Sequence, residues 1–115
     1  MISSRHRFHG YGSLKATYQF GQTTRGPQFS IKVRPNSRRR SYRLAVVVSR
    51  KVNKSAVARN RIRRRIYEVI RQLEADIKEP HDMVISVFSD TVLEQKTAEL
   101  ASQIKRQLKQ AKVIK

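Results

Sequence analysis

The stretch that decides the fold is residues 42–73, which read YRLAVVVSRKVNKSAVARNRIRRRIYEVIRQL. Its first part, residues 42–49, has a continuous apolar centre, which predicts a strand buried on both faces. A polar turn follows and ends in Ser55, a candidate helix N-cap. Apolar residues then recur at helical spacing, so we expect a long helix from about Ala56 to Lys78. The pattern therefore predicts a strand, a basic turn and an amphipathic helix in succession.

Two further elements are expected before this stretch. Residues 28–34 alternate between apolar and polar side chains, which predicts a half-buried strand. We expect that strand to pair antiparallel with residues 42–49. A short helix is expected over residues 14–20, with Ser13 as its N-cap and Gly21 as its end.

Two more elements are expected after the long helix, whose region Pro80 should end. Residues 83–88 are apolar and predict a buried strand, and Ser89 or Asp90 should cap a last amphipathic helix over residues 91–111. The order is helix, strand, strand, helix, strand, helix. It predicts an α/β (α+β) two-layer sandwich, in which helices pack on a small, mostly antiparallel sheet.

The charge of the chain is unevenly distributed. There are 26 Lys and Arg residues against 8 Asp and Glu residues, a formal net charge of +18. Residues 1–67 contain 18 of the basic residues and no acid, whereas the rest of the chain is balanced. Because such an excess opposes folding by self-repulsion, we expect a polyanionic partner, with nucleic acid ahead of a membrane surface. We divide the chain into a flexible basic arm, residues 1–12, and a single RNA-binding domain, residues 13–115.

Several classes of function are disfavoured by composition. The chain has no cysteine, which excludes disulfides and thiolate catalysis. It has no apolar run of about 20 residues and no secretory signal, so we expect a cytoplasmic protein that does not bind membranes. His6 and His9 have no acid nearby, and the carboxylates are sparse, so we expect no metal site and no catalytic residue in the protein.

Residues 49–65 are the most informative segment for function. They place basic side chains around the start of a helix, whose free N–H groups and dipole favour phosphate. Asn60 can bond a base or a ribose 2′-hydroxyl, or it can fix a neighbouring arginine. A solvated helix face would normally mix charges, but this run contains no acid before Glu68.

This segment resembles the signature of the bacterial ribonuclease P protein subunit. In that family a hydrophobic strand ends in a Ser-Lys-Lys-Val-like turn, which here reads Ser49 to Val52. A helix start containing Arg-Asn-Arg follows, which here is Arg59-Asn60-Arg61, and Arg64 also matches. The expected order of elements is similar over nearly the whole chain.

The resemblance implies a protein that binds the catalytic RNA and the single-stranded 5′ leader of precursor tRNA. It implies a left-handed βαβ crossover in the fold, and it places the leader in a shallow cleft between the sheet and the long helix. The residues it implies for the catalytic RNA are Arg50, Lys51, Arg59, Asn60, Arg61, Arg64 and Arg65. The residues it implies for the leader cleft are Leu14, Tyr18, Ser30, Lys32 and Ser49.

Tyr18 has two interpretations. Family members often carry aromatic residues at the positions of Leu14 and Lys32, and their absence here leaves Tyr18 as the better candidate for stacking on a base. Packing of Tyr18 in the core is the other interpretation.

By the same resemblance, the chain would be part of an endoribonuclease that forms the mature 5′ end of tRNA. The RNA subunit would catalyse the cleavage of the phosphodiester with Mg²⁺, and the RNA would bind most of that Mg²⁺ itself. The expected partners are ribonuclease P catalytic RNA and precursor tRNA, with no obligate protein partner evident. A ribosomal or general structural RNA-binding protein is the alternative, and a DNA-binding protein that reads a groove with the long helix is another.

Overall fold

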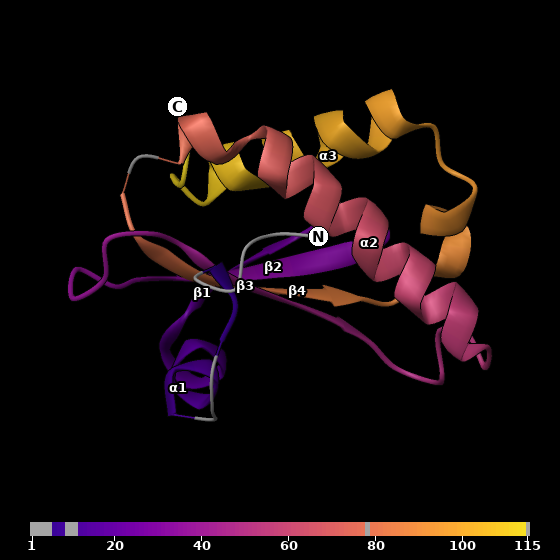
Figure 1. Cartoon of the computed structure of the whole chain (residues 1–115), viewed down its shortest axis with the longest axis horizontal. Helices are drawn as coiled ribbons and strands as arrows, with labels where there is room; N and C mark the ends of the chain where they lie inside the picture. Colours follow the sequence, from indigo (N-terminus) through magenta and orange to yellow (C-terminus); the bar gives the residue numbers. More distant parts are fainter. Residues whose placement is uncertain (1–5, 9–11, 78, 115) are drawn as a thin grey trace.

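The computed structural model describes residues 6–8, 12–77 and 79–114, and it is built around one four-stranded sheet (Figure 1). In chain order the elements are α1 (Gly12–Phe20), β1 (Gln22–Arg25), β2 (Phe29–Pro35), β3 (Arg43–Val48), α2 (Ala56–Gln72), the 3₁₀ helix η2 (Glu74–Asp76), β4 (His81–Val87), the 3₁₀ helix η3 (Asp90–Leu93) and α3 (Thr97–Gln110). The expected mixture of helices and a small sheet is confirmed. Within the described ranges, no helix is long and apolar enough to cross a membrane.

The strands lie in the order β1-β2-β4-β3. Strand β2 is antiparallel to both β1 and β4, whereas β3 is parallel to β4. The expected direct pairing of β2 with β3 is wrong, because β4 lies between them. Strand β4 is nearly continuously buried, so it takes the centre, where both faces are covered. The unit β3–α2–β4 is a βαβ crossover, and its left hand stays an expectation from the family resemblance.

The main core lies between the sheet and the pair α2 and α3. Phe29, Ile31 and Val33 of β2 are buried in it, which confirms the predicted alternation. The apolar faces of α2 and α3 close the core from one side, while α1 lies on the opposite side of the sheet (Figure 1). The sheet therefore has one fully covered face and one face that α1 covers only in part.

Strand β3 is not buried on both faces, contrary to expectation. Leu44, Val46 and Val48 are buried, but Val47 is 39% exposed. The reason is the position of α1, which packs on β2 and β4 and not on β3. The apolar side chain of Val47 is consequently left on an open part of the sheet.

Helix α2 begins as predicted and ends early. The hydroxyl of Ser55 accepts a hydrogen bond from the Ala58 N–H at 3.2 Å, which confirms the N-cap. The helix ends at Gln72, well before Pro80, and the expected end at Lys78 lies outside the described residues. The Leu73 N–H bonds the carbonyls three and four residues back, which tightens the last turn and leads into η2.

The expected last helix is two elements. Ser89 caps the short η3, and α3 begins only at Thr97. A side chain from another element satisfies backbone groups at the break. The carbonyls of Val92 and Gln95 accept hydrogen bonds from the Arg65 guanidinium, which stabilises the irregular connection between η3 and α3.

Helix α1 begins at Gly12, so Ser13 lies inside it and the predicted cap is wrong; the Ser13 side chain lies outside the described set. Gly21 ends the helix as predicted, and its N–H donates to the Thr17 carbonyl at 2.9 Å. A Cβ at Gly21 would lie 2.5 Å from that same carbonyl oxygen, so the close approach requires glycine.

A buried ion pair fixes the start of β3. Arg43 donates to both carboxylate oxygens of Asp82 on β4 at 2.8 Å, and Asn36 donates to Asp82 at 2.9 Å. Asp82 is fully buried. Of the expected arm, residues 6–8 and Gly12 are described, and the remainder lies outside the described residues. The His6 ring stacks on Tyr42 with centroids 4.1 Å apart, and Arg43 lies 4.9 Å over the Phe8 ring.

Candidate nucleic-acid interface

The cations most available to a partner lie in the turn after β3 and along α2. Arg50, Lys51, Arg61 and Arg64 are all exposed. In the part of the chain that the structure describes, none of these four side chains forms an ion pair or a hydrogen bond. Unpaired arginine forks and lysine ammonium groups are suited to phosphate.

Two other residues implied for the catalytic RNA are held by the protein itself. Arg59 donates to the carbonyls of Asn53 and Lys54 at 3.0 and 2.9 Å, which fixes the turn before α2. Asn60 accepts a hydrogen bond from Arg63 at 2.5 Å. Of the roles expected for Asn60, the structure favours the orientation of a neighbouring arginine on the helix surface.

Arg65 is also used inside the protein. Both terminal nitrogens of its guanidinium donate to backbone carbonyls, one to Val92 and the other to Gln95. This side chain ties α2 to the connection between η3 and α3. The sequence does not reveal this role, because Arg65 stands in a run of exposed arginines and its acceptors lie far along the chain.

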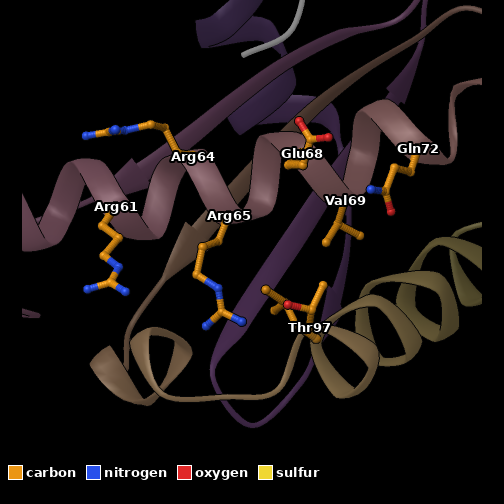
Figure 2. Close-up of a pocket in the computed structure, with 8 residues that line it drawn as sticks. Arg61, Arg64, Arg65, Glu68, Val69, Gln72 and Thr97 are labelled. Carbon is orange, nitrogen blue, oxygen red and sulfur yellow. The ribbon is translucent and has the colours of Figure 1, made fainter.

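Two hollows lie on the flanks of α2. The first, which we call the α2–α3 hollow, has a volume of about 380 Å³ (Figure 2). Figure 2 shows Arg61, Arg65 and Gln72 extending toward the side on which Thr97 begins α3. The second hollow, of about 340 Å³, is lined by Arg7, Asn60, Arg63, Arg64 and Tyr67. Arg64 lines both, so it stands on the ridge between them.

Glu68 is the first acid in the chain and stands at the rim of the α2–α3 hollow. Arg71 donates to its two carboxylate oxygens at 2.6 and 3.1 Å. These hydrogen bonds lower the pKa of Glu68 below its usual value, and the same pair raises the pKa of Arg71. Glu68 therefore stays a carboxylate and breaks the run of positive charge along α2.

The residues implied for the leader lie on the α1 side of the sheet. Lys32 donates to the Tyr18 carbonyl at 2.5 Å, and its ammonium lies 5.9 Å from the centre of the Tyr18 ring. Tyr18 is 40% exposed, so its interpretation as a core residue is wrong. Leu14 and Ser30 are half-buried, and Ser49 is exposed just after β3.

The expected position of the leader cleft, between the sheet and the long helix, is wrong for these residues. Ser30 and Lys32 alternate with the core residues of β2, so they point to the face opposite α2. Helix α1, not α2, flanks that face (Figure 1).

An exposed aromatic side chain on the same face was expected to be buried, because residues 83–88 predicted a buried strand, and that expectation is wrong for Phe88. Phe88 follows β4 and is 43% exposed, and Arg25 of β1 lies 5.1 Å from the centre of its ring. In the register of the sheet, Ser86 pairs with Ser30 on one side and with Val47 on the other. Phe88 lies two residues after Ser86, and side chains two apart on an extended chain point to the same face. This spacing is the signal in the sequence that could have placed Phe88 on the face of Ser30 and Lys32.

The fold and surfaces define a class of protein: a small RNA-binding protein with a polycationic helix on one side of its sheet and cations beside exposed aromatic rings on the other. The family model described as Ribonuclease P matches residues 2–112. The chain belongs to the ribonuclease P protein family. It is accordingly the protein component of a ribonucleoprotein tRNA-processing enzyme, and its partner is the ribonuclease P RNA.

Individual relatives agree with this assignment. The ribonuclease P protein component of Pseudanabaena sp. is 31% identical, over 99% of this chain and 97% of the relative. That of Brevibacillus brevis is 32% identical, over 96% of this chain and 86% of the relative. Because the chain belongs to this family, the alternatives of a ribosomal protein and of a DNA-binding protein are set aside.

Solved structures agree on the fold. The ribonuclease P protein of Staphylococcus aureus superposes with a TM-score of 0.82 at 24% identity, covering 96% of this chain and 98% of that one. The protein of Thermotoga maritima gives a TM-score of 0.78 at 21% identity, covering 90% and 96%.

Proposed function

We propose that this chain uses the two sides of its sheet for two different RNAs. The α2 side binds the catalytic RNA, and the α1 side binds the single-stranded 5′ leader of precursor tRNA. By holding both, the protein promotes removal of the leader. The observation that carries the proposal is the set of four exposed cations around α2 that have no protein partner among the described residues.

The α2 side suits a large, folded RNA. Arg50 and Lys51 come from the turn after β3, and Arg61 and Arg64 come from α2, so the charge is spread over the turn and the helix that follows it. Such a surface neutralises several phosphates of one partner at once and reduces the repulsion between two polyanions. Arg59, Asn60 and Arg65 then support this surface by fixing the turn, a neighbouring arginine and the position of α3.

The α1 side suits a single strand. Tyr18 and Phe88 each present a half-exposed ring beside a cation, Lys32 and Arg25 respectively. Bases of a single strand stack on such rings, and nearby cations pair with the phosphates. Leu14, Ser30 and Ser49 complete the surface in this proposal.

We propose that Mg²⁺ is held mainly by the RNA subunit, where it supplies the charge stabilisation that cleavage of a phosphodiester requires. The carboxylates of the chain do not fit a metal site. Asp82 is paired with Arg43, Glu68 with Arg71, and Glu74 accepts a hydrogen bond from the Tyr42 hydroxyl. The part of the chain that is described contains no group of three or more His, Cys, Asp or Glu residues placed to hold a metal ion. A cytoplasmic location belongs to the same proposal, because it follows from these partners.

The test is cleavage of a precursor tRNA at low Mg²⁺ by a bacterial ribonuclease P RNA, with and without the full chain. We expect the chain to stimulate cleavage, and no stimulation would contradict the proposal. Leader binding is tested with Tyr18→Ala, with Tyr18→Phe as the matched variant that keeps the ring.

Loss of one stacked base lowers affinity by about 5- to 150-fold, so Tyr18→Ala should weaken binding of leader-bearing tRNA by a factor in that range. Binding of mature tRNA should not change. An equal loss for both tRNAs would mean that Tyr18 does not contact the leader.

A further inference from the structure

We propose that the α2–α3 hollow receives one unstacked base of the catalytic RNA. The inference rests on the proposed contact between α2 and that RNA, and it adds the feature of the RNA that is recognised. The hollow is concave and has a volume of about 380 Å³. That volume falls within the range of about 300–1,000 Å³ typical of small-molecule sites, whereas a flat helix surface offers only phosphate contacts.

The floor of the hollow is apolar. Val69 of α2 and Leu100 of α3 line it, and both are almost completely buried. An apolar floor gives nothing to a phosphate. Val69 and Leu100 expose almost no surface, so most of the van der Waals contact to the flat face of a base would come from the hydrocarbon stems of the longer side chains around them. A base in a duplex has both faces covered by its neighbours, so only an unstacked base can use this floor.

Polar groups stand above the floor, where the edge of a base would lie. Gln72 is exposed on α2, and Thr97 is exposed at the start of α3 across the hollow. An amide offers a donor and an acceptor together, and a hydroxyl can act as either. Gln72 and Thr97 can therefore bond the edge of a nucleobase, which carries both hydrogen-bond donors and acceptors. The Gln72 side chain also hydrogen-bonds Glu68, which holds the amide at the edge of the hollow.

The charges along α2 set the direction in which the nucleotide lies. Arg61 and Arg64 stand at one end of the hollow and attract phosphate. Glu68 stands in the other half and is paired with Arg71, and the described residues that line that half of the hollow include no cation to attract phosphate. The backbone of the RNA therefore runs past the arginine end, and the base points toward Gln72. Figure 2 shows Arg61 and Gln72 at opposite ends of this stretch of α2.

The hollow on the other flank of α2 lacks this combination. It is lined by three arginines, Asn60 and Tyr67, and it has no aliphatic floor. Each hollow has three arginines in its lining, so both can receive phosphate, but only the α2–α3 hollow combines them with aliphatic side chains at its base.

The first test blocks the hollow without changing charge. Thr97→Phe places a ring over the floor, and Gln72→Ala removes the amide. Gln110→Phe, at the exposed end of α3, is the matched control. Binding of the full-length ribonuclease P RNA is measured over a series of salt concentrations, and urea unfolding verifies that each variant is folded.

We expect Thr97→Phe and Gln72→Ala each to weaken binding by about ten-fold, which is the order of one lost base contact. The slope of affinity against salt should stay unchanged, because no charge is removed. Gln110→Phe should bind like the original protein. Unchanged affinity for both hollow variants would overturn the proposal, as would a loss accompanied by a change in the salt slope.

The second test identifies the base. Because the chain contains no cysteine, Gln72→Cys provides a unique attachment point for a short photo-crosslinker. We expect crosslinks to one unpaired nucleotide, which Thr97→Phe in the same chain suppresses. Crosslinks confined to paired nucleotides would refute the base contact while leaving the RNA contact of α2 intact. Failure of the original protein to bind the RNA would instead refute the proposed function, and this inference with it.

Discussion

Replacing Arg61 and Arg64 together with alanine separates binding from stability. Both side chains are exposed, and within the described ranges neither makes an ion pair or a hydrogen bond. Their loss therefore removes nothing that holds the fold, and we expect the free energy of unfolding to change by no more than about 0.5 kcal/mol. Binding of the catalytic RNA should weaken, because two phosphates lose their counter-charges.

The size of the effect follows from counterion release. Each neutralised phosphate contributes about 0.7–0.9 to the slope of log affinity against log salt concentration, so the double variant should lose about 1.4–1.8 of that slope. The assay is equilibrium titration of the full-length RNA at several KCl concentrations. The double lysine variant is the control, since it keeps both charges and should keep most of the slope.

Arg65→Ala should instead lower the stability of the fold, which the double variant of Arg61 and Arg64 leaves nearly unchanged. Its guanidinium holds the carbonyls of Val92 and Gln95, and losing both bonds should reduce the free energy of unfolding by about 1–3 kcal/mol. An unchanged salt slope for the double variant of Arg61 and Arg64 would refute the reasoning. So would a loss of stability in that variant as large as that of Arg65→Ala.

Three further predictions concern stability, and urea unfolding measures each of them. Asp82→Ala leaves Arg43 buried without its partner and should cost about 3–5 kcal/mol; a cost below 1 kcal/mol would contradict the importance of the pair. Gly26→Ala drives a methyl group into the buried Gln107 side chain, and we expect a loss of about 1–3 kcal/mol; an unchanged midpoint would mean that Gln107 can move aside. Tyr42→Phe removes a 2.6 Å hydrogen bond to a partly exposed carboxylate and should cost about 0.5–1.5 kcal/mol, so full stability would show that water replaces it.

Local signals in the sequence predicted local structure well. The alternation of β2, the Ser55 cap and the glycine that ends α1 all depend on residues within a few positions of one another. The basic run before Glu68 likewise indicated the nucleic-acid-binding helix, because charge is a property of the residues themselves. The family resemblance supplied the identity of the partner RNA, which charge alone does not.

What the sequence did not predict depends on distant partners. The alternation of β2 shows which residues are buried but not which strand lies beside it, so the place of β4 was missed. The connection before α3 is held by Arg65, about 30 residues earlier, and no local pattern indicates the carbonyls that this arginine bonds. For the same reason, the charge pattern predicted that Arg61 and Arg65 both bind RNA. In the structure Arg65 bonds backbone carbonyls of the protein, whereas Arg61 is exposed and available to the RNA.

The central place of β4 has a consequence for how the chain is made. Strands β2 and β3 both pair with β4 and not with each other, so a growing chain that ends before His81 has two strands without a common neighbour. The acid-free basic segment, residues 1–67, leaves the ribosome before β4, the strand that connects β2 with β3 in the sheet. Because the joining contacts are distant in sequence, we expect their closure to be slow, and we expect premature termination to leave exposed strand edges that are prone to aggregation.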